Sequence, residues 1–333
     1  MSDITTKYLG MTLKSPIIVG SCGLTGSPDK VQELEQNGAG AVVLKSIFEE
    51  EIAFEYQDVL QQVSPGAYNF EAFDYYDQQV KGERLSEYIQ LIQGCKRQTS
   101  IPVIASVNCA YSHEWSVFAE RLQAAGADAI ELNMFFPPSD LKRTSEERKQ
   151  LYFDIVEKVL SRVSIPVALK ISHYMDDLGA MIQRLSKSGV SALVLFNRFY
   201  SPDFKIDGGP DDPPRVVQTN VLSTPTEFVL PLRWVALMAG RVGCDLVASG
   251  GIHDGSAVIK QILAGAQAVQ VVSTLYRNGA ERLQAMNREL QDWMIQNEYY
   301  ELDQFRGSMS QAKAQDPAVY ERFQFMKHFG GLG

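Results

Sequence analysis

The chain alternates two kinds of short apolar segment, and this repeat limits the folds that it can adopt. Four segments follow a proline or a short polar turn, and four follow a glycine in the pattern Gly-x-x-Ala-apolar. Such a glycine can take the left-handed position that ends a helix, and the small alanine lets the next strand pack closely. The first kind covers 15–21, 101–106, 165–170 and 245–249, and the second covers 38–44, 126–132, 189–195 and 265–271.

Helical patterns separate these segments, which are nearly continuous apolar runs, as expected for strands buried on both faces of a parallel sheet. Eight strand–helix units predict an α/β fold, a closed (β/α)8 TIM barrel. An open, doubly wound sheet is the alternative, but the first strand lacks the Gly-x-Gly-x-x-Gly turn of that fold. The helical patterns cover 29–36, 85–98, 114–125, 146–162, 177–187, 226–239, 255–263 and 280–296.

The rest of the chain is arranged around this barrel. Residues 3–13 predict an N-terminal hairpin below it, and 298–333 predict a C-terminal extension that packs on the outside or on a partner. Two long connections, 47–84 after the second strand and 198–225 after the sixth, predict loops that cover a site. We therefore expect one domain over residues 1–333, which is long enough for a single large core.

Composition excludes several classes of function. The net charge is −9 without a Lys/Arg cluster, which argues against nucleic acid or an anionic membrane as partner. The longest apolar stretch, 228–240, contains Arg233 and is too short to span a bilayer. The N-terminus does not read as a signal peptide, so a cytoplasmic location is expected. The four cysteines lie far apart and the histidines show no metal-ligand spacing, so neither a disulfide framework nor a metal site is expected.

The ends of the predicted strands carry the main functional signal. The active site of a β/α barrel lies at the C-terminal ends of its strands. In this chain every one of these ends is small or polar, whereas a chance set would include several apolar residues. The ends, in chain order, are Ser21-Cys22, Lys45-Ser46, Asn108, Asn133, Lys170, Asn197, Gly250-Gly251 and Ser273-Thr274.

The last two strand ends predict a phosphate site. Gly250-Gly251 follows the seventh strand and Ser273-Thr274 follows the eighth, where barrel enzymes commonly bind phosphate through backbone N–H groups. A tight turn is the alternative reading of the two glycines alone. Together with the Ser-Thr pair, they indicate a phosphorylated ligand.

Lysine and asparagine side chains indicate which chemical groups this ligand has besides a phosphate. Lys170 ends a buried strand, so it should face an anion or an electron-rich group such as the N1/O2 edge of a reduced flavin. A salt bridge to a loop carboxylate is the alternative, and Lys45 carries the same argument more weakly because it can reach solvent. Asn133 and Asn197 suit the amide edge of a flavin or a cyclic substrate, unless they only cap loops. A phosphate-sugar aldolase or isomerase with a Schiff base on Lys170 is a different class that these residues also allow.

The residues also match a family. From about Thr6 to Arg277, the chain resembles class 1 dihydroorotate dehydrogenases and the FMN barrel of dihydropyrimidine dehydrogenases. The motifs are specific together rather than singly. They are Ser15-Pro-Ile, Ser21-Cys22-Gly23, Leu44-Lys45-Ser46, Phe73-Asp74-Tyr75-Tyr76, Ala125-Gly-Ala-Asp-Ala-Ile-Glu-Leu-Asn133, Leu169-Lys170-Ile171, Ser249-Gly-Gly-Ile252 and Gly265-Ala-Gln-Ala-Val-Gln-Val271.

The resemblance implies an FMN oxidoreductase that acts on a CH–CH bond of a dihydropyrimidine-like ring, as in pyrimidine biosynthesis. A protein base would remove a proton from the carbon next to the one that gives the hydride. Relatives are commonly dimers, which implies a homodimer, and an iron–sulfur relay would need a separate electron-transfer partner. The implied catalytic and substrate positions are Lys45, Asn69, Asn133 and Asn197, and the cofactor positions are Ser21, Cys22, Lys45, Ser46, Asn108, Asn133, Lys170, Gly250, Gly251, Ser273 and Thr274.

One loop departs from the family pattern. The family's Asn-Leu-Ser-Cys-Pro-Asn reads Asn133-Met-Phe-Phe-Pro-Pro138 here, so the position of the catalytic cysteine is Phe136. A benzyl side chain cannot accept a proton, and Pro138 cannot hydrogen bond to a substrate through its side chain. The sequence leaves open a substrate that needs no cysteine base, a base relocated to Ser139, His173 or Tyr111, or a catalytically divergent or inactive flavin-binding homologue with a regulatory role.

Overall fold

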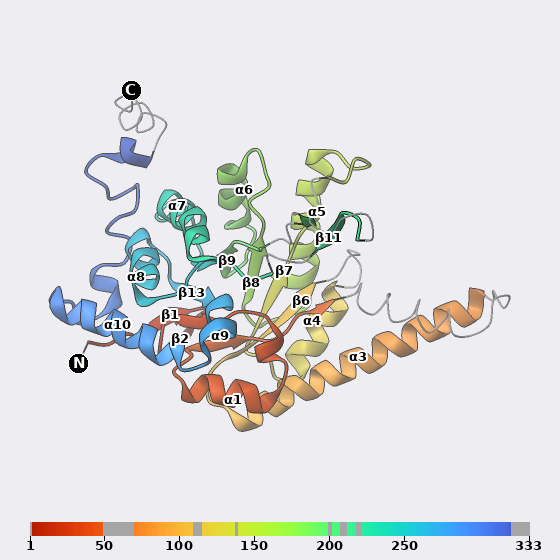
Figure 1. The fold of residues 1–333 in the computed structure, drawn as a ribbon. Helices are drawn as coiled ribbons and strands as arrows, with labels where there is room; N and C mark the ends of the chain where they lie inside the picture. The colour runs from red at the N-terminus through yellow and green to blue at the C-terminus, as the bar shows by residue number, and fades with distance from the viewer. Residues whose placement is uncertain are drawn as a thin grey trace.

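The protein is a closed parallel β/α barrel, as the repeat predicts (Figure 1). The computed structural model describes residues 2–48, 70–108, 115–136, 139–198, 202–206, 212–217 and 221–320. The β13–β3, β3–β4 and β4–β6 pairings close the ring and exclude the open sheet. The strands, in ring order, are β3 (Ile17–Val19), β4 (Ala41–Val43), β6 (Val103–Asn108), β7 (Ala129–Asn133), β8 (Val167–Ile171), β9 (Ala192–Leu195), β12 (Asp245–Ser249) and β13 (Ala268–Val271).

Helices follow each barrel strand and lie around the ring (Figure 1). The four glycines of the repeat have φ values of 91°, 97°, 96° and 120°, which confirms the left-handed conformation expected where each preceding helix ends. The helices are α1 (Pro28–Gln36), α3 (Phe70–Gln98), α4 (Trp115–Ala124), α5 (Ser145–Leu160), α6 (Leu178–Leu185), α7 (Val229–Met238), α8 (Gly255–Ala264) and α10 (Arg282–Gln296), with the short α9 (Ser273–Asn278) before α10.

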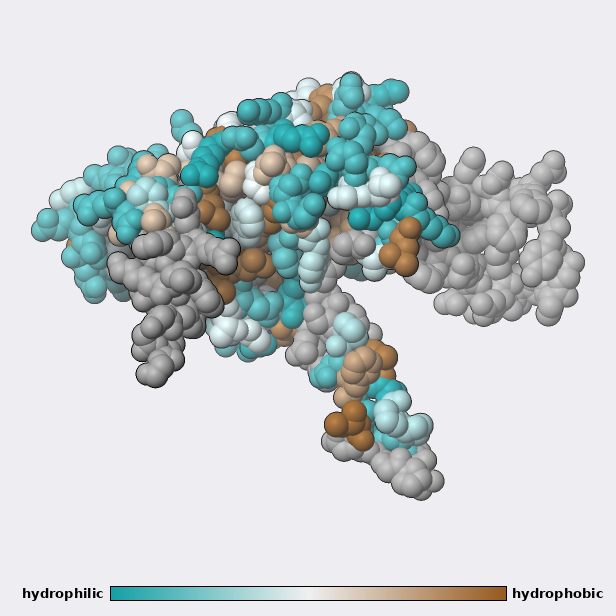
Figure 2. All heavy atoms as spheres, turned by 90° about the horizontal axis from the view of Figure 1, so that it is seen from above, coloured by the Kyte–Doolittle hydropathy of each residue, from teal (hydrophilic) through white to brown (hydrophobic). Residues whose placement is uncertain are grey.

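Both long connections contain more regular structure than the sequence indicated. The helix after β4 begins at Phe70 and not near residue 85, because Glu, Gln and Lys favour a helix even where aromatic residues obscure the pattern. The strand β5 (Ile47–Phe48) extends the sheet beside β6. The connection after β9 forms an antiparallel hairpin, β10 (Asp203–Lys205) and β11 (Arg215–Val217). In Figure 2 this hairpin stands away from the body as an arm with apolar side chains, and Phe204 and Val216 lie exposed at opposing positions.

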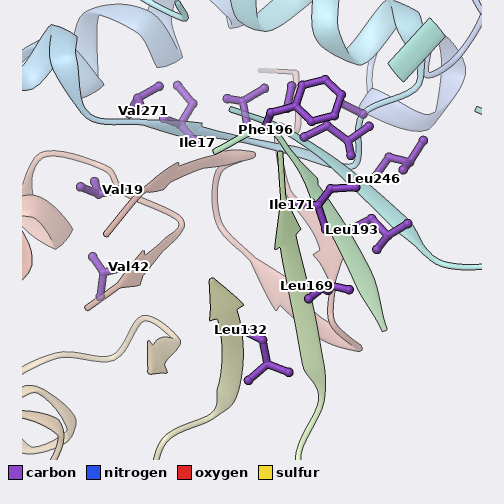
Figure 3. Close-up of a cluster of buried hydrophobic side chains, with 14 of the residues drawn as sticks. Ile17, Val19, Val42, Leu132, Leu169, Ile171, Leu193, Phe196, Leu246 and Val271 are labelled. Atoms are coloured by element: carbon purple, nitrogen blue, oxygen red, sulfur yellow. The ribbon is translucent and has the colours of Figure 1, made fainter. Parts of the chain in front are cut away.

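Side chains alternate between the two faces of each barrel strand, as the geometry of a β-strand requires. Those that point outward pack with the apolar faces of the helices and form the larger of two buried clusters (Figure 3). Members of this cluster include Ile17, Val19, Val42, Leu132, Leu169, Ile171, Leu193, Leu246 and Val271. The side chains that point inward form a separate cluster, which fills the interior of the barrel.

The predicted N-terminal hairpin, β1 (Thr6–Tyr8) and β2 (Met11–Leu13), closes the bottom of the barrel. Tyr8 and Leu13 are fully buried against the inward side chains, and the Leu9 backbone N–H donates a hydrogen bond to Asp245 Oδ2 at 3.0 Å. The alanine of each Gly-x-x-Ala repeat faces this hairpin and leaves room for the Tyr8 ring. These alanines are Ala41, Ala129, Ala192 and Ala268, joined by Ala168.

The chain that follows α10 packs along the outside of the barrel. Phe305 is fully buried, and Glu301 forms a β-bridge with Asp3. The backbone N–H groups of Gly307 and Met309 donate to the carbonyl oxygens at the end of α8, at 2.9 and 2.8 Å. Residues up to 320 therefore contact the barrel directly. Within the described ranges, no helix is both long enough and apolar enough to cross a bilayer.

The contact between the hairpin and the barrel gives a prediction about Tyr8. Its ring is fully buried, while its hydroxyl has no hydrogen-bond partner among the described residues, and burial raises its pKa. Tyr8→Ala should lower the free energy of unfolding by about 3–5 kcal/mol because it leaves a cavity. Tyr8→Phe should change it by less than about 1 kcal/mol, or raise it, because no hydrogen bond is lost. Urea unfolding followed by circular dichroism measures both, and a large loss in Tyr8→Phe would contradict the packing described here.

Candidate active site

A cavity of about 840 Å³ opens at the C-terminal ends of the barrel strands. Its lining comes from the ends of β7, β8, β12 and β13 and from the segments that follow β3, β4 and β9. Most of the residues singled out in the sequence meet here. They are Ser21, Cys22, Lys45, Ser46, Asn133, Lys170, Asn197, Gly250, Gly251 and Ser273.

Two predicted residues that the structure describes do not line this cavity, and a third is not described. Asn108 ends β6 outside the lining. Thr274 is fully buried, and its hydroxyl donates a hydrogen bond to the His253 carbonyl oxygen at 3.1 Å. Asn69 lies outside the described residues, so its predicted role stays a prediction.

A polar layer lies directly above the alanines inside the barrel. Glu131 follows Ala129 by two residues, Lys170 follows Ala168 by two, and Gln270 follows Ala268 by two. Because the side-chain period of a strand is two, each of these side chains points into the barrel one step closer to the cavity. Glu131, Lys170 and Gln270 all line the cavity floor.

These three side chains form one network. The Lys170 ammonium donates a hydrogen bond to Gln270 Oε1 at 2.6 Å, and the Gln270 amide N–H donates to Glu131 Oε2. The Lys170 Nζ atom also lies 3.8 Å from Glu131 Oε1. Lys170 therefore has a carboxylate partner on the neighbouring strand and not on a loop, and it still faces the cavity. Sequence analysis missed Glu131 and Gln270, although their spacing from the repeat alanines places them in this layer.

Asn197 connects the ends of three strands. Its side-chain N–H groups donate to the carbonyl oxygens of Met134 and Lys170 at 3.1 and 3.2 Å. Both partners are acceptors, so the orientation of the amide is fixed and Oδ1 accepts no hydrogen bond from the described residues. Asn133 lines the cavity nearby, and its amide makes no hydrogen bond to them either. Both amides can therefore bind a ligand with N–H and C=O groups.

A chain of hydroxyl groups borders another side of the cavity. Ser46 Oγ lies 2.9 Å from Ser21 Oγ and 2.7 Å from Ser106 Oγ. The Ser106 backbone is held by the Tyr88 hydroxyl, which accepts from its N–H at 2.9 Å and donates to its carbonyl oxygen at 3.1 Å. This network fixes the ends of β3, β4 and β6 relative to one another. Lys45, which precedes Ser46, lines the cavity with an exposed side chain.

The two glycines after β12 adopt conformations that side chains rarely take, with φ values of 102° and 70°. A Cβ atom on Gly251 would lie 2.1 Å from the Phe228 backbone nitrogen, so only glycine fits there. A Cβ atom on Gly250 would meet nothing within 4 Å. Ser223, in the long connection after β9, accepts from the Gly251 N–H at 3.3 Å, and its own N–H donates to Ser273 Oγ at 2.8 Å. Sequence analysis missed Ser223 because that connection has no regular pattern.

Phe136 does not line the cavity. Its ring packs edge-on against Tyr152 at a centroid distance of 5.1 Å, beside a smaller cavity of about 220 Å³. His173, one of the candidates for a relocated base, packs edge-on against Phe196 with a distance of 5.7 Å between the ring centroids. Its Nδ1 is buried without a hydrogen-bond partner among the described residues, and burial lowers its pKa.

The remaining acid–base candidates are placed differently. Ser139 is exposed in a turn, and Tyr111 and Pro138 lie outside the described residues. Cys22 lines the cavity, and burial raises the pKa of its thiol. The thiol form of Cys22 is therefore favoured near neutral pH, where it is a poor proton acceptor.

Comparison with known proteins identifies the family of the chain. A family model described as dihydroorotate dehydrogenase matches residues 3–294. The catalytic subunit of dihydroorotate dehydrogenase B (NAD(+)) from Thermoplasma volcanium is 28% identical over 321 residues, which cover 92% of this chain and 98% of the relative. The putative dihydroorotate dehydrogenase A (fumarate) of Aeropyrum pernix is 26% identical, over 85% of this chain and 90% of the relative. The chain therefore belongs to the dihydroorotate dehydrogenase family, whose enzymes are FMN-dependent oxidoreductases acting on CH–CH groups.

Proposed function

We propose that this chain is a cytoplasmic FMN oxidoreductase that oxidises or reduces a CH–CH bond in a dihydropyrimidine-like ring. The observation that carries the proposal is the convergence of Lys170, Asn133, Asn197 and the two glycines on one cavity above the polar layer. FMN would supply the hydride-accepting centre. The residues of the chain would bind it, orient the substrate and control the charge around both.

The cavity fits such a cofactor in size and in chemistry. Its volume of about 840 Å³ lies within the roughly 300–1,000 Å³ typical of ligand pockets. Gly250 leaves open space where a side chain would otherwise lie, and Ser273 lines the same cavity. In this proposal, that end holds the phosphate. The Lys170 ammonium would lie against the electron-rich N1/O2 edge of the ring, where a positive charge stabilises a negative one.

Substrate binding is assigned to the two asparagines and Lys45. The free Oδ1 of Asn197 would accept a ring N–H, and the amide of Asn133 can donate to a carbonyl oxygen and accept from an N–H. These contacts suit a ring that alternates N–H and C=O groups. In this proposal, Asn69 would complete the set from the connection after β4.

The proton step distinguishes this chain from the family pattern. Phe136 has no basic atom, its ring faces the smaller cavity, and the buried Cys22 thiol favours its protonated form. We therefore propose a substrate whose reaction does not depend on a base at position 136. A flavin-binding homologue with a regulatory role is the second candidate, and the placement of Phe136 favours it over ordinary dihydroorotate oxidation.

Electrons would leave the site through a separate acceptor. Among the relatives, one name specifies NAD(+) and a catalytic subunit, and another specifies fumarate. In this proposal, the chain forms a homodimer and passes electrons to a small molecule or to a second protein.

Cofactor binding gives the first prediction from this proposal. Purified protein reconstituted with FMN should absorb near about 450 nm, as an oxidised flavin does. The apoprotein should bind FMN about a hundredfold more tightly than riboflavin, because only FMN makes the charge-assisted hydrogen bonds of the phosphate site. Flavin fluorescence titration measures both dissociation constants. A protein that stays colourless with excess FMN would contradict the proposal, and equal affinities would contradict the phosphate site.

Asn197 gives a second prediction. Asn197→Ala should slow anaerobic flavin reduction by the best reductant in a panel of dihydropyrimidines and nicotinamides by about tenfold to a hundredfold, the cost of one or two hydrogen bonds. Stopped-flow absorbance measures the rate. The control is Asn297→Ala, which removes an exposed asparagine at the end of α10 and should leave the rate unchanged. Equal rates in Asn197→Ala and wild type would remove Asn197 from the substrate site.

The direction of the Phe136 side chain gives a third prediction. Phe136→Cys restores the residue type of the family base, but the side chain at this position points toward Tyr152 and the smaller cavity. We therefore expect no measurable gain in anaerobic bleaching of the flavin by dihydroorotate across pH 6–9, a range of about three pH units around the reference pKa of a thiol. A clear gain would show that the loop after β7 turns toward the main cavity when substrate binds.

A further inference from the structure

Glu131 is a buried carboxylate for which the proposed reaction has no direct use. Its side chain is 1% exposed and lies in the interior of the barrel, and Oε1 has no hydrogen-bond partner among the described residues. An unpaired charge in such a place is costly, so it persists only with compensation. That compensation comes from the Lys170 ammonium at 3.8 Å and from the Gln270 amide.

Gln270 reaches Glu131 across the full width of the barrel. Around the ring, β13 and β7 are four steps apart in either direction, through β12, β9 and β8 or through β3, β4 and β6. The two side chains therefore come from opposite walls and meet inside the barrel. Gln270 is 2% exposed, which leaves its amide little freedom to turn away.

The amide of Gln270 can have only one orientation in this network. Lys170 can only donate and the Glu131 carboxylate can only accept, so the amide oxygen must face lysine and the amide nitrogen must face glutamate. Gln270 thereby holds the ammonium 2.6 Å from its oxygen, while Nζ stays 3.8 Å from Glu131 Oε1. Without this amide, nothing in the network would keep the two charged groups from closing into a direct pair.

We propose that Glu131 and Gln270 are positioning residues that act through Lys170. Gln270 holds the ammonium toward the cavity, and Glu131 partly offsets its positive charge, so that together they set how strongly the site favours a negatively charged flavin ring. This inference rests on the proposed function, because it needs FMN beside Lys170.

The two residues should affect the flavin in opposite directions. Glu131→Gln removes the negative charge and leaves the ammonium uncompensated, so the site should stabilise a negative ring more strongly. Gln270→Leu removes the spacer and lets Lys170 close onto Glu131, away from the cavity, so the site should stabilise it less. A purely structural role would weaken the site in both variants and could not produce opposite signs.

Sulfite provides a direct probe, because its addition to flavin places negative charge on the ring. The experiment uses the FMN-loaded full chain and measures the sulfite Kd from the loss of flavin absorbance. Glu131→Gln should lower the Kd by about tenfold, the effect of one unit charge acting across a protein interior. Gln270→Leu should raise it severalfold. The midpoint potential of the bound FMN, measured in parallel, should rise in the first variant and fall in the second.

The matched control is Asp128→Asn. Asp128 directly precedes β7, the strand that carries Glu131, and its carboxylate pairs with Lys96 at 2.7 Å. The variant therefore removes one negative charge at the end of the strand that lies away from the cavity. Its sulfite Kd should equal that of wild type. If Glu131→Gln fails to fold, Glu131→Ala removes the same charge and should likewise lower the Kd, so the comparison of opposite signs is kept.

The outcomes separate the two proposals. A wild-type protein that takes up no FMN overturns both the proposed function and this inference. A wild-type protein that binds FMN, with both variants within twofold of its sulfite Kd or shifted in the same direction, overturns only the inference. A lower Kd in Glu131→Gln together with a higher Kd in Gln270→Leu supports the assignment of both as positioning residues, and the reverse pair of shifts overturns it.

Discussion

The closed ring of parallel strands makes every second side chain point into a shared interior, and the rest of the structure depends on this constraint. At the lower level the interior holds alanines, and the N-terminal hairpin inserts Tyr8 and Leu9 against them. One step further along β7, β8 and β13, the inward side chains are Glu131, Lys170 and Gln270, which line the cavity floor. On these three strands, the inward side chain changes from apolar to polar within one period of two residues.

The polar layer is stable because its charges compensate one another. A lone lysine or a lone glutamate at this depth would lose its hydration without a new hydrogen-bond partner. Here the two charged groups are linked by a glutamine that accepts from the lysine and donates to the glutamate. The same arrangement places a positive group at the cavity floor. In the proposed function, this group lies beside the flavin ring, so structural stability and cofactor chemistry would depend on the same three side chains.

The loop after β7 is where this chain departs from the sequence pattern of its family. The two glycines and the two asparagines line the main cavity, while Phe136 packs against Tyr152 on α5 and does not line it. A large aromatic ring gains more from burial against another ring than from exposure in a polar cavity. Phe136 therefore supplies no basic atom at this position, and its ring points toward Tyr152 and the smaller cavity.

The sequence by itself determined the barrel, because the glycines that end helices and the runs of buried strand are local features. Most of the site residues that it singled out do line the cavity, since the fold places all strand ends on one face. Only the tertiary structure decided which side chains touch. Lys170 meets a glutamine 100 residues away, and that glutamine meets a glutamate 139 residues away. Ser223 reaches the glycine turn from an irregular connection. Such contacts depend on how the ring closes and on the paths of the loops, which no local pattern records.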